Sequence, residues 1–113
     1  MKLYGLKTCD TCRKARKWLD AEGIQHVFVD VRADGIGADD VARWAEAVGI
    51  ETLLNRRGTT WRGLSDADKA KGEGDAAVAL MATHPALIKR PVFEKDGDVL
   101  VGFSEQVQVA LRG

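Results

Sequence analysis

The sequence has little of several features that would set its class. Its 113 residues include only two cysteines, two prolines and two histidines, and the 17 basic residues balance the 17 acidic ones. No apolar run approaches the ~20 residues that a membrane-spanning helix needs. The zero net charge argues against a protein whose main ligand is a long phosphate backbone. The length suits one compact domain over residues 1–113, since two smaller domains would each bury too little surface.

The start of the chain lacks the basic residues and the long apolar stretch of a secretory signal. Residues 2–6 are predicted to form a short strand, and the protein is expected to be cytoplasmic. In a reducing cytoplasm, Cys9 and Cys12 do not suit a structural disulfide. Two cysteines cannot close a zinc site alone, and neither His26 nor His84 has ligand spacing to them, so no metal is expected.

The first part of the chain predicts a strand, a helix and a second strand. A helix is expected after Cys12 to about Glu22, because its apolar residues recur at helical spacing. These residues are Ala15, Trp18 and Leu19. Residues 25–31 alternate, with Val27, Val29 and Val31 expected on one side of a strand. Consecutive strands joined by a helix form a parallel, right-handed unit.

The middle of the chain predicts helices. Asp39 or Asp40 is expected to cap one helix, Ser65 to start a short one, and Asp75 to cap another that ends before His84. This last helix is apolar almost all round, which predicts burial on several sides.

The end of the chain predicts a hairpin and a helix. Asp96 and Gly97 form a turn signal between two apolar segments, because type I′ turns need positive φ. Ser104 is expected to cap the final helix. Taken in order, the elements predict an α/β fold with thioredoxin-like topology: a mixed sheet of about four strands, with a central helical insertion at about residues 37–84.

Cys9 and Cys12 form a Cys-x-x-Cys pair between the first strand and the first helix. A thiol must ionise to attack, and an ordinary pKa of about 8.5 keeps most of it protonated at neutral pH. Helix-start N–H groups and a hydrogen bond from the second thiol favour a lower pKa for Cys9. The basic residues Arg13, Lys14 and Arg16 follow in the next turn and favour it too. Cys9 is therefore the expected nucleophile and Cys12 the resolving thiol; the alternative is two small buried residues.

Basic residues cluster although the net charge is zero. Residues 1–20 carry six basic groups and only two acidic ones. A mid-chain cluster contains Arg56, Arg57 and Arg62, and Arg90 stands in a third. Guanidinium groups bind carboxylates and oxyanions, so these clusters are candidates for holding an anionic substrate. The alternative is surface charge in contact with water.

Three stretches resemble the arsenate reductase (ArsC) family, in its Spx/YffB-like branch and most closely its YffB-like proteins. They are residues 8–16, which hold both cysteines, residues 53–61 (Leu-Leu-Asn-Arg-Arg-Gly-Thr-Thr-Trp) and residues 84–92 (His-Pro-Ala-Leu-Ile-Lys-Arg-Pro-Val). The resemblance runs nearly end to end and implies a thioredoxin-like fold with a helical insertion. It also implies a glutathione-linked thiol reductase.

The resemblance implies roles for four residues at the two ends of the chain. Cys9 matches the family's catalytic cysteine. Cys12 falls where redox-switch members have a second cysteine and arsenate reductases have serine. Arg90 matches an arginine that binds oxyanion in the reductases, and Pro91 matches the cis-proline beside the thiol of thioredoxin folds.

The middle stretch departs from the arsenate reductases. They have an arginine directly after the Leu-Leu pair, where this chain has Asn55, and Arg56 or Arg57 would have to replace it. A further oxyanion-binding arginine near their last strand has no counterpart in residues 101–104. Both departures argue against strong arsenate reduction.

Together these observations predict a cytoplasmic thiol-disulfide reductase with glutathione as co-substrate and no bound cofactor. Cys9, Cys12 and Arg90 are the expected catalytic residues. The expected substrate-binding residues are Arg13, Asn55, Arg56, Arg57 and Pro91. The expected partner is glutathione or another small anionic thiol or oxyanion, with no membrane and no direct nucleic acid. The alternatives are a glutathione-coupled arsenate reductase, and an Spx-like redox-sensing transcriptional regulator that binds RNA polymerase.

Overall fold

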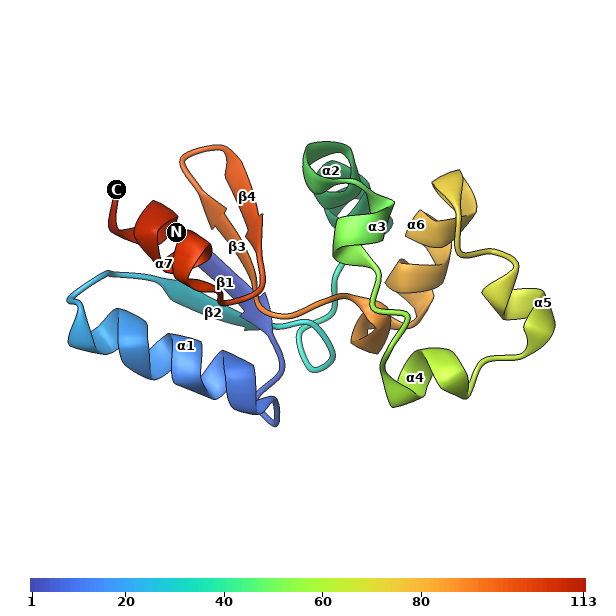
Figure 1. Cartoon of the computed structure of the whole chain (residues 1–113), viewed down its shortest axis with the longest axis horizontal. Coiled ribbons are helices and arrows are strands. Elements are labelled where there is room, and N and C mark those ends of the chain that lie inside the picture. Colours follow the sequence, from blue (N-terminus) through green and yellow to red (C-terminus); the bar gives the residue numbers. More distant parts are fainter. The chain divides into compact units, whose positions relative to one another are not determined.

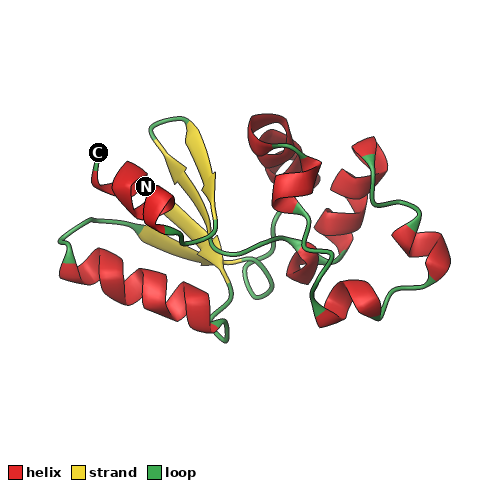
Figure 2. Ribbon diagram, in the orientation of Figure 1, coloured by secondary structure: helices red, strands yellow, loops and turns green.

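The computed structural model describes residues 1–113 and divides them into two compact units (Figure 1). The first unit comprises residues 1–34 and 90–113, and the second comprises residues 35–89. All four strands lie in the first unit, whereas the second contains helices, turns and one isolated bridge (Figure 2). No helix has both the length and the apolar character needed to span a membrane.

The first unit is a mixed four-stranded sheet with two helices. Its elements in chain order are β1 (Lys2–Gly5), α1 (Asp10–Ala21), β2 (Val27–Asp30), β3 (Val92–Lys95), β4 (Asp98–Val101) and α7 (Glu105–Arg112). The sheet order is β2-β1-β3-β4; β1 pairs with β2 in parallel and with β3 antiparallel. This is the predicted α/β arrangement with thioredoxin-like topology, including the parallel β-α-β unit.

Two local predictions at the end of this unit are confirmed. Asp96 and Gly97 join β3 to β4 with φ values of 51° and 85°, as a type I′ turn requires. The Ser104 hydroxyl accepts a hydrogen bond from the Val107 N–H at 3.3 Å, which caps α7. Both features are set by neighbouring residues, so they could be predicted without knowing the rest of the fold.

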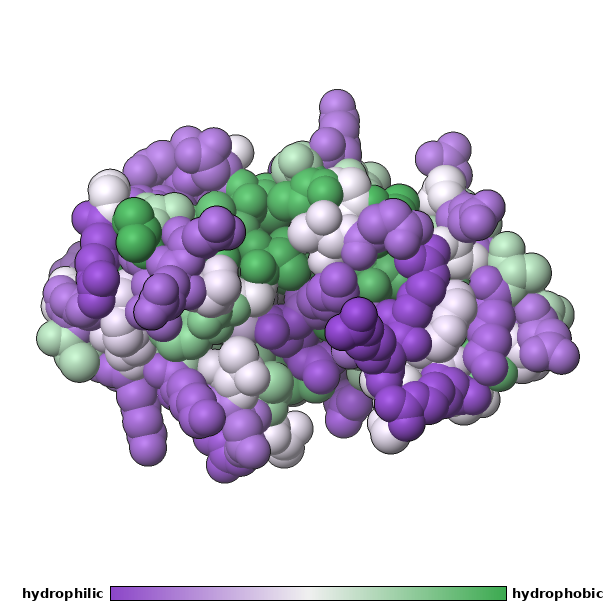
Figure 3. All heavy atoms as spheres, in the orientation of Figure 1, coloured by the Kyte–Doolittle hydropathy of each residue, from purple (hydrophilic) through white to green (hydrophobic).

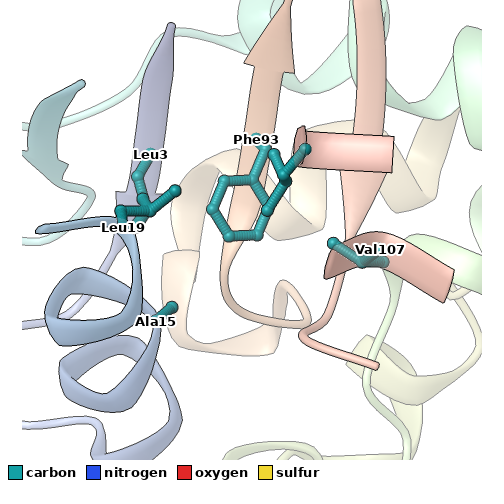
Figure 4. Close-up of a cluster of buried hydrophobic side chains, with 6 residues drawn as sticks. Leu3, Ala15, Leu19, Phe93 and Val107 are labelled. Carbon is teal, nitrogen blue, oxygen red and sulfur yellow. The ribbon is translucent and has the colours of Figure 1, made fainter. Parts of the chain in front are cut away.

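The core of the first unit lies between the sheet and the helices α1 and α7 (Figure 4). It consists of the buried residues Leu3, Ala15, Leu19, Phe93, Val107 and Leu111. In β2, Phe28 packs against this core, whereas Val27 on the opposite side of the strand is 59% exposed. Alternate side chains of a strand face opposite sides, and the larger Phe28 takes the core side.

The second unit consists of short helices. They are α2 (Ala38–Val48), α3 (Ile50–Leu53), α4 (Thr59–Arg62), α5 (Asp66–Lys69), α6 (Gly74–Thr83) and the 3-10 helix η1 (Pro85–Leu87). α2 packs against α3 and α6 and buries Val41 and Trp44. From α6, Ala77, Leu80 and Met81 are buried.

Two of the three predicted caps in this unit are wrong. Gly37 is the N-cap of α2, and Asp40 instead accepts the Gly37 N–H from inside the first turn. Glu73 is the N-cap of α6, while Asp75 lies in its first turn. Asp in a first turn complements the helix dipole without being the cap, so composition alone does not separate the two positions. Ser65 caps α5 as predicted, accepting the Asp68 N–H.

The prediction that the last of these helices is buried on several sides is wrong. Ala76 and Ala79 of α6 are exposed. Because alanine is small and weakly apolar, it is tolerated on a solvent-facing side, and its presence there made the helix look apolar all round.

Candidate active site: two thiols at the start of α1

The end of β1 and the start of α1 position Cys9. The chain turns tightly after β1, and the Cys9 N–H donates to the Leu6 carbonyl at 3.1 Å. Cys9 is the N-cap residue of α1, with extended φ and ψ, and its carbonyl accepts the Arg13 N–H at 3.0 Å. An N-cap side chain lies next to the N–H groups that have no partner within the helix. The Cys9 sulfur is therefore placed where a negative charge is stabilised.

Asp30 at the end of β2 anchors the turn that precedes Cys9. Its carboxylate accepts N–H groups from Lys7 at 3.1 Å, Arg32 at 2.9 Å and Ala33 at 2.8 Å. The hydrogen bond from the Ala33 N–H lowers the pKa of Asp30 most, and burial opposes it. The N–H groups of Lys7 and Arg32 lower the pKa further, so it stays below its ordinary value. The sequence analysis missed this residue. Its signal was an aspartate between a strand and a turn, where a carboxylate binds nearby N–H groups.

Arg90 and Pro91 approach the thiol from the start of β3. The Arg90–Pro91 peptide bond is cis, as the resemblance implied, and Pro91 is buried. The Arg90 side chain lies beside the Cys9 sulfur, where its charge and its N–H groups lower the pKa of the thiol. Residues far apart in the chain thus meet at one sulfur atom because β3 lies beside β1.

The pKa of the Cys9 thiol is lowered from its ordinary value. Partial burial raises it, but this effect is outweighed by hydrogen bonds from the N–H and the thiol of Cys12 and by the hydrogen bond and charge of Arg90. Each of these groups favours the thiolate over the neutral thiol. Cys9 is therefore the better nucleophile of the pair at neutral pH.

The pKa of Cys12 shifts the other way, to about 11. Burial is the main cause, and the hydrogen bond to Cys9 and the charge on Cys9 raise the pKa further. The Leu6 N–H and the charge of Arg90 act in the opposite direction. Cys12 is fully buried, and both cysteines are free thiols. A Cβ atom added to Gly5 would lie 2.5 Å from the Cys12 sulfur, so Gly5 provides the space that the sulfur occupies. This close contact between β1 and α1 was also missed by the sequence analysis.

The basic residues of α1 do not act on Cys9 as expected. Arg13 forms an ion pair with Asp10, and the Arg16 guanidinium lies 4.3 Å from the centre of the Phe28 ring. Arg90 is the cation that lowers the pKa of Cys9. Proximity in sequence was misleading here, because successive helix residues point in different directions.

The middle stretch and the start of the late stretch meet within the second unit. Leu54 and Ile88 form an antiparallel bridge, and the Asn55 N–H donates to the Leu87 carbonyl at 2.7 Å. The Asn55 side-chain oxygen accepts the Arg57 N–H at 3.0 Å, which closes a turn. Asn55 thus has a local structural use, and its predicted role in substrate binding stays a prediction.

Arg56 and Arg57 differ sharply in their surroundings. Arg56 pairs with Glu51, donates to the Gly72 carbonyl at 2.6 Å, and lies 5.6 Å from the centre of the Trp61 ring. The side chain of Arg57 is exposed. Of the two, Arg57 is the guanidinium that a ligand reaches without breaking contacts within the fold.

The structure brings the predicted catalytic residues together, and the predicted substrate-binding residues are divided between the two units. Cys9, Cys12, Arg90 and Pro91 form one cluster in the first unit; Arg13 lies in the same unit but pairs with Asp10. The second unit contains the remaining three, Asn55, Arg56 and Arg57. No three His, Cys, Asp or Glu side chains of the chain are placed to hold a metal ion.

Comparison with known proteins identifies the family. Residues 4–110 match the model of the ArsC family, and the chain belongs to that family. A solved structure named YffB protein is 44% identical and superposes with a TM-score of 0.91, covering 97% of this chain and 96% of that one.

Two further relatives are informative. An arsenate reductase (ArsC) related protein from Brucella melitensis is 40% identical, with a TM-score of 0.77 over 96% of this chain and 91% of that one. The global transcriptional regulator Spx of Bacillus subtilis is 25% identical over 91% of this chain and 79% of its own length. The expected membership of the ArsC family, near YffB-like and Spx proteins, is thus confirmed.

Proposed function

We propose that this protein is a cytoplasmic thiol-disulfide reductase that uses glutathione and has Cys9 as its nucleophile. The observation that carries the proposal is the opposite displacement of the two thiol pKa values, that of Cys9 lowered and that of Cys12 raised to about 11. One sulfur is prepared to attack, while its neighbour holds a proton and donates a hydrogen bond to it. Membership of the ArsC family supports a redox role for such a thiol.

In the first step, the Cys9 thiolate attacks the glutathione sulfur of a mixed disulfide. A bond forms between the Cys9 sulfur and the glutathione sulfur, the old disulfide breaks, and its other sulfur leaves as a thiolate that takes a proton from water. Arg90 stabilises the attacking thiolate before the step. It also lies beside the glutathione adduct afterwards, where it favours an anionic group.

In the second step, either Cys12 or a second glutathione releases the bound glutathione. When Cys9 enters a mixed disulfide it loses its charge, which removes two of the effects that raise the pKa of Cys12. Cys12 then ionises more easily, attacks the Cys9 sulfur and expels glutathione, leaving a Cys9–Cys12 disulfide that two further glutathione molecules reduce. Alternatively, the second glutathione attacks directly and leaves as glutathione disulfide.

The experiment is reaction of the purified protein with a peptide–glutathione mixed disulfide. We expect stoichiometric release of free peptide thiol and a glutathione adduct on Cys9, or an internal disulfide, in the mass spectrum. The Cys9→Ser variant should release none, and Cys12→Ser should accumulate the adduct if Cys12 resolves it. Equal release by wild type and Cys9→Ser would rule out the proposal.

Arsenate reduction is a second candidate, supported by Arg90 at the thiol and by the Brucella melitensis relative. Asn55 replaces the arginine that the resemblance leads one to expect, which weighs against it. This candidate requires that glutathione be oxidised in proportion to added arsenate. A rate that does not respond to arsenate would exclude it.

An Spx-like role, supported by the Bacillus subtilis relative, is a third candidate. It requires RNA polymerase to bind the chain with an affinity that changes when Cys9 and Cys12 are oxidised. Co-purification of polymerase with reduced and oxidised protein tests this directly, and no binding in either state would exclude it.

A further inference from the structure

The solvent-facing side of α1 carries a charged stripe that the proposed chemistry does not use. Asp10, Arg13, Lys14 and Lys17 recur at the spacing that places them on one side of a helix, and they line a shallow depression of about 310 Å³. We call these four residues the α1 stripe. The opposite side of the helix buries Cys12, Ala15 and Leu19 in the first unit. Figure 3 shows hydrophilic side chains projecting along α1, at the lower left.

The α1 stripe has an excess of positive charge. Its one carboxylate, on Asp10, is paired with Arg13. Lys14 and Lys17 are exposed and form no ion pair or hydrogen bond within the chain, whose residues are all described. Two ammonium groups therefore lie without internal partners on the helix that Cys9 begins.

The shape of the stripe suits a polypeptide better than a small molecule. Small-molecule sites are enclosed, whereas this depression lies open to solvent on the surface of α1. From Asp10 to Lys17 the helix rises about 10 Å at ~1.5 Å per residue. An extended chain covers that length with about three residues. The stripe begins at the residue after Cys9, so a chain bound at the sulfur can continue along it.

The charge pattern favours an acidic polypeptide over a nucleic acid. The stripe has no aromatic side chain on which a base could stack, and Asp10 and Asp20 stand near the two ends of α1. The whole chain has no net charge, so there is no broad field to hold a phosphate backbone. Two lysines are enough to pair with two carboxylates of a peptide.

We propose that the α1 stripe docks an acidic segment next to the disulfide of a polypeptide substrate. This rests on the proposed function of Cys9 as a thiol-disulfide nucleophile and names the substrate class for it. Carboxylates on the segment pair with Lys14 and Lys17 and guide the disulfide to the Cys9 sulfur. The exchange step is the one already described, with the peptide's own thiol as the leaving group.

The test uses three synthetic peptides that each hold one cysteine as a glutathione mixed disulfide. They are identical except that the cysteine is flanked by glutamates, by lysines or by serines. We expect the glutamate peptide to react with Cys9 about tenfold faster than the serine peptide at low ionic strength, and the lysine peptide to react more slowly. High salt should remove the differences, because charges at this distance are screened.

The decisive variant is Lys14→Glu/Lys17→Glu, with Lys69→Glu/Lys71→Glu in the second unit as a control of equal charge. The first should lose or invert the preference for glutamate peptides while keeping the rate with the serine peptide, and the control should behave as wild type. Equal rates for the three peptides, or the same loss in both variants, would overturn the proposal.

A binding measurement separates this proposal from the function of Cys9. Fluorescent glutamate peptides that lack cysteine should bind wild type more weakly as salt increases, and should bind Lys14→Glu/Lys17→Glu less well, whether or not Cys9 turns over any disulfide. If no peptide disulfide reacts but this binding is seen, only the proposed function fails. If a single-stranded oligonucleotide displaces the peptide at physiological salt, the partner class proposed here is wrong.

Discussion

Two clusters in the molecule each combine an arginine with a glycine that leaves space for a neighbouring side chain. In one cluster that side chain is a cysteine, and in the other it is a tryptophan. The thiol cluster of the first unit places Arg90 against Cys9, and Gly5 leaves space for the Cys12 sulfur. The tryptophan cluster of the second unit places Arg56 over Trp61, with Gly72 leaving space for the indole. An added Cβ would lie 2.5 Å from the sulfur at Gly5 and 2.7 Å from the ring at Gly72.

The difference between the clusters lies in the partners of the two guanidinium groups. Arg56 binds the Glu51 carboxylate and the Gly72 carbonyl, so its guanidinium joins two segments of the second unit. Arg90 lies beside a sulfur whose ionisation it favours. The tryptophan cluster should therefore affect stability and leave thiol chemistry unchanged, whereas changes in the thiol cluster should alter the ionisation of Cys9.

The largest loss of stability is expected for Gly72→Ala. The new methyl group would overlap the rigid Trp61 ring and lie 3.2 Å from the Lys69 carbonyl, and overpacking of this kind costs about 1–3 kcal/mol. Denaturant unfolding should show a loss near the upper end of that range, with the pH dependence of Cys9 alkylation unchanged. Gly63→Ala, whose Cβ has no contact closer than 3.4 Å, is the control and should change stability by less than about 1 kcal/mol. Comparable losses in both variants would contradict the role given to Gly72.

A smaller loss, of about 2 kcal/mol, is expected for Arg56→Ala, because it removes a half-buried charged hydrogen bond and a cation–π contact. Arg57→Ala is the matched control, since its side chain is exposed, and should change stability by about 0.5 kcal/mol or less. Denaturant midpoints of the two variants measure the difference. If Arg57→Ala is the more destabilising change, then Arg57 has the structural role and the assignment of that role to Arg56 is wrong.

Local sequence signals were sufficient for much of the fold. The Asp96-Gly97 turn and the Ser65 and Ser104 caps depend on residues within a few positions of each other. The side of β2 that faces the core could not be predicted, because Val27 and Phe28 are both apolar and only the packing of the sheet decides between them.

The candidate site was predictable only where it is local. The lowered pKa of Cys9 follows in part from its place at the start of α1, which the spacing of the cysteines indicates. Arg90 was expected at the thiol through the resemblance alone. Gly5 and Asp30 were missed because their importance comes from contacts between elements. The Cys12 sulfur on α1 packs against Gly5 of β1, and the Asp30 carboxylate at the end of β2 binds the turn before Cys9.

Gly5→Ala should destabilise the protein by about 1 kcal/mol, less than Gly72→Ala, because the Cys12 side chain can rotate away whereas the Trp61 ring cannot. Unlike Gly72→Ala, it should also raise the pKa of Cys9, since a displaced Cys12 no longer donates its hydrogen bond. The pH dependence of Cys9 alkylation in a Cys12→Ser background provides a check. There the smaller hydroxyl should lessen the effect of the alanine, and an undiminished effect would show that Gly5 acts by another route.

The clearest effect on chemistry is expected for Arg90→Gln. Arg90 favours the Cys9 thiolate, so its loss should move the pKa of Cys9 upward, toward the ordinary value. Alkylation requires the thiolate, so its rate rises as pH passes upward through the pKa of Cys9 and is then constant; in Arg90→Gln the rise should begin at higher pH. Arg56→Gln removes a charge from the tryptophan cluster and should leave the profile unchanged. Equal upward shifts in the two variants would mean that the ionisation of Cys9 responds to the total charge of the chain, and the distinction between the two clusters would then be wrong.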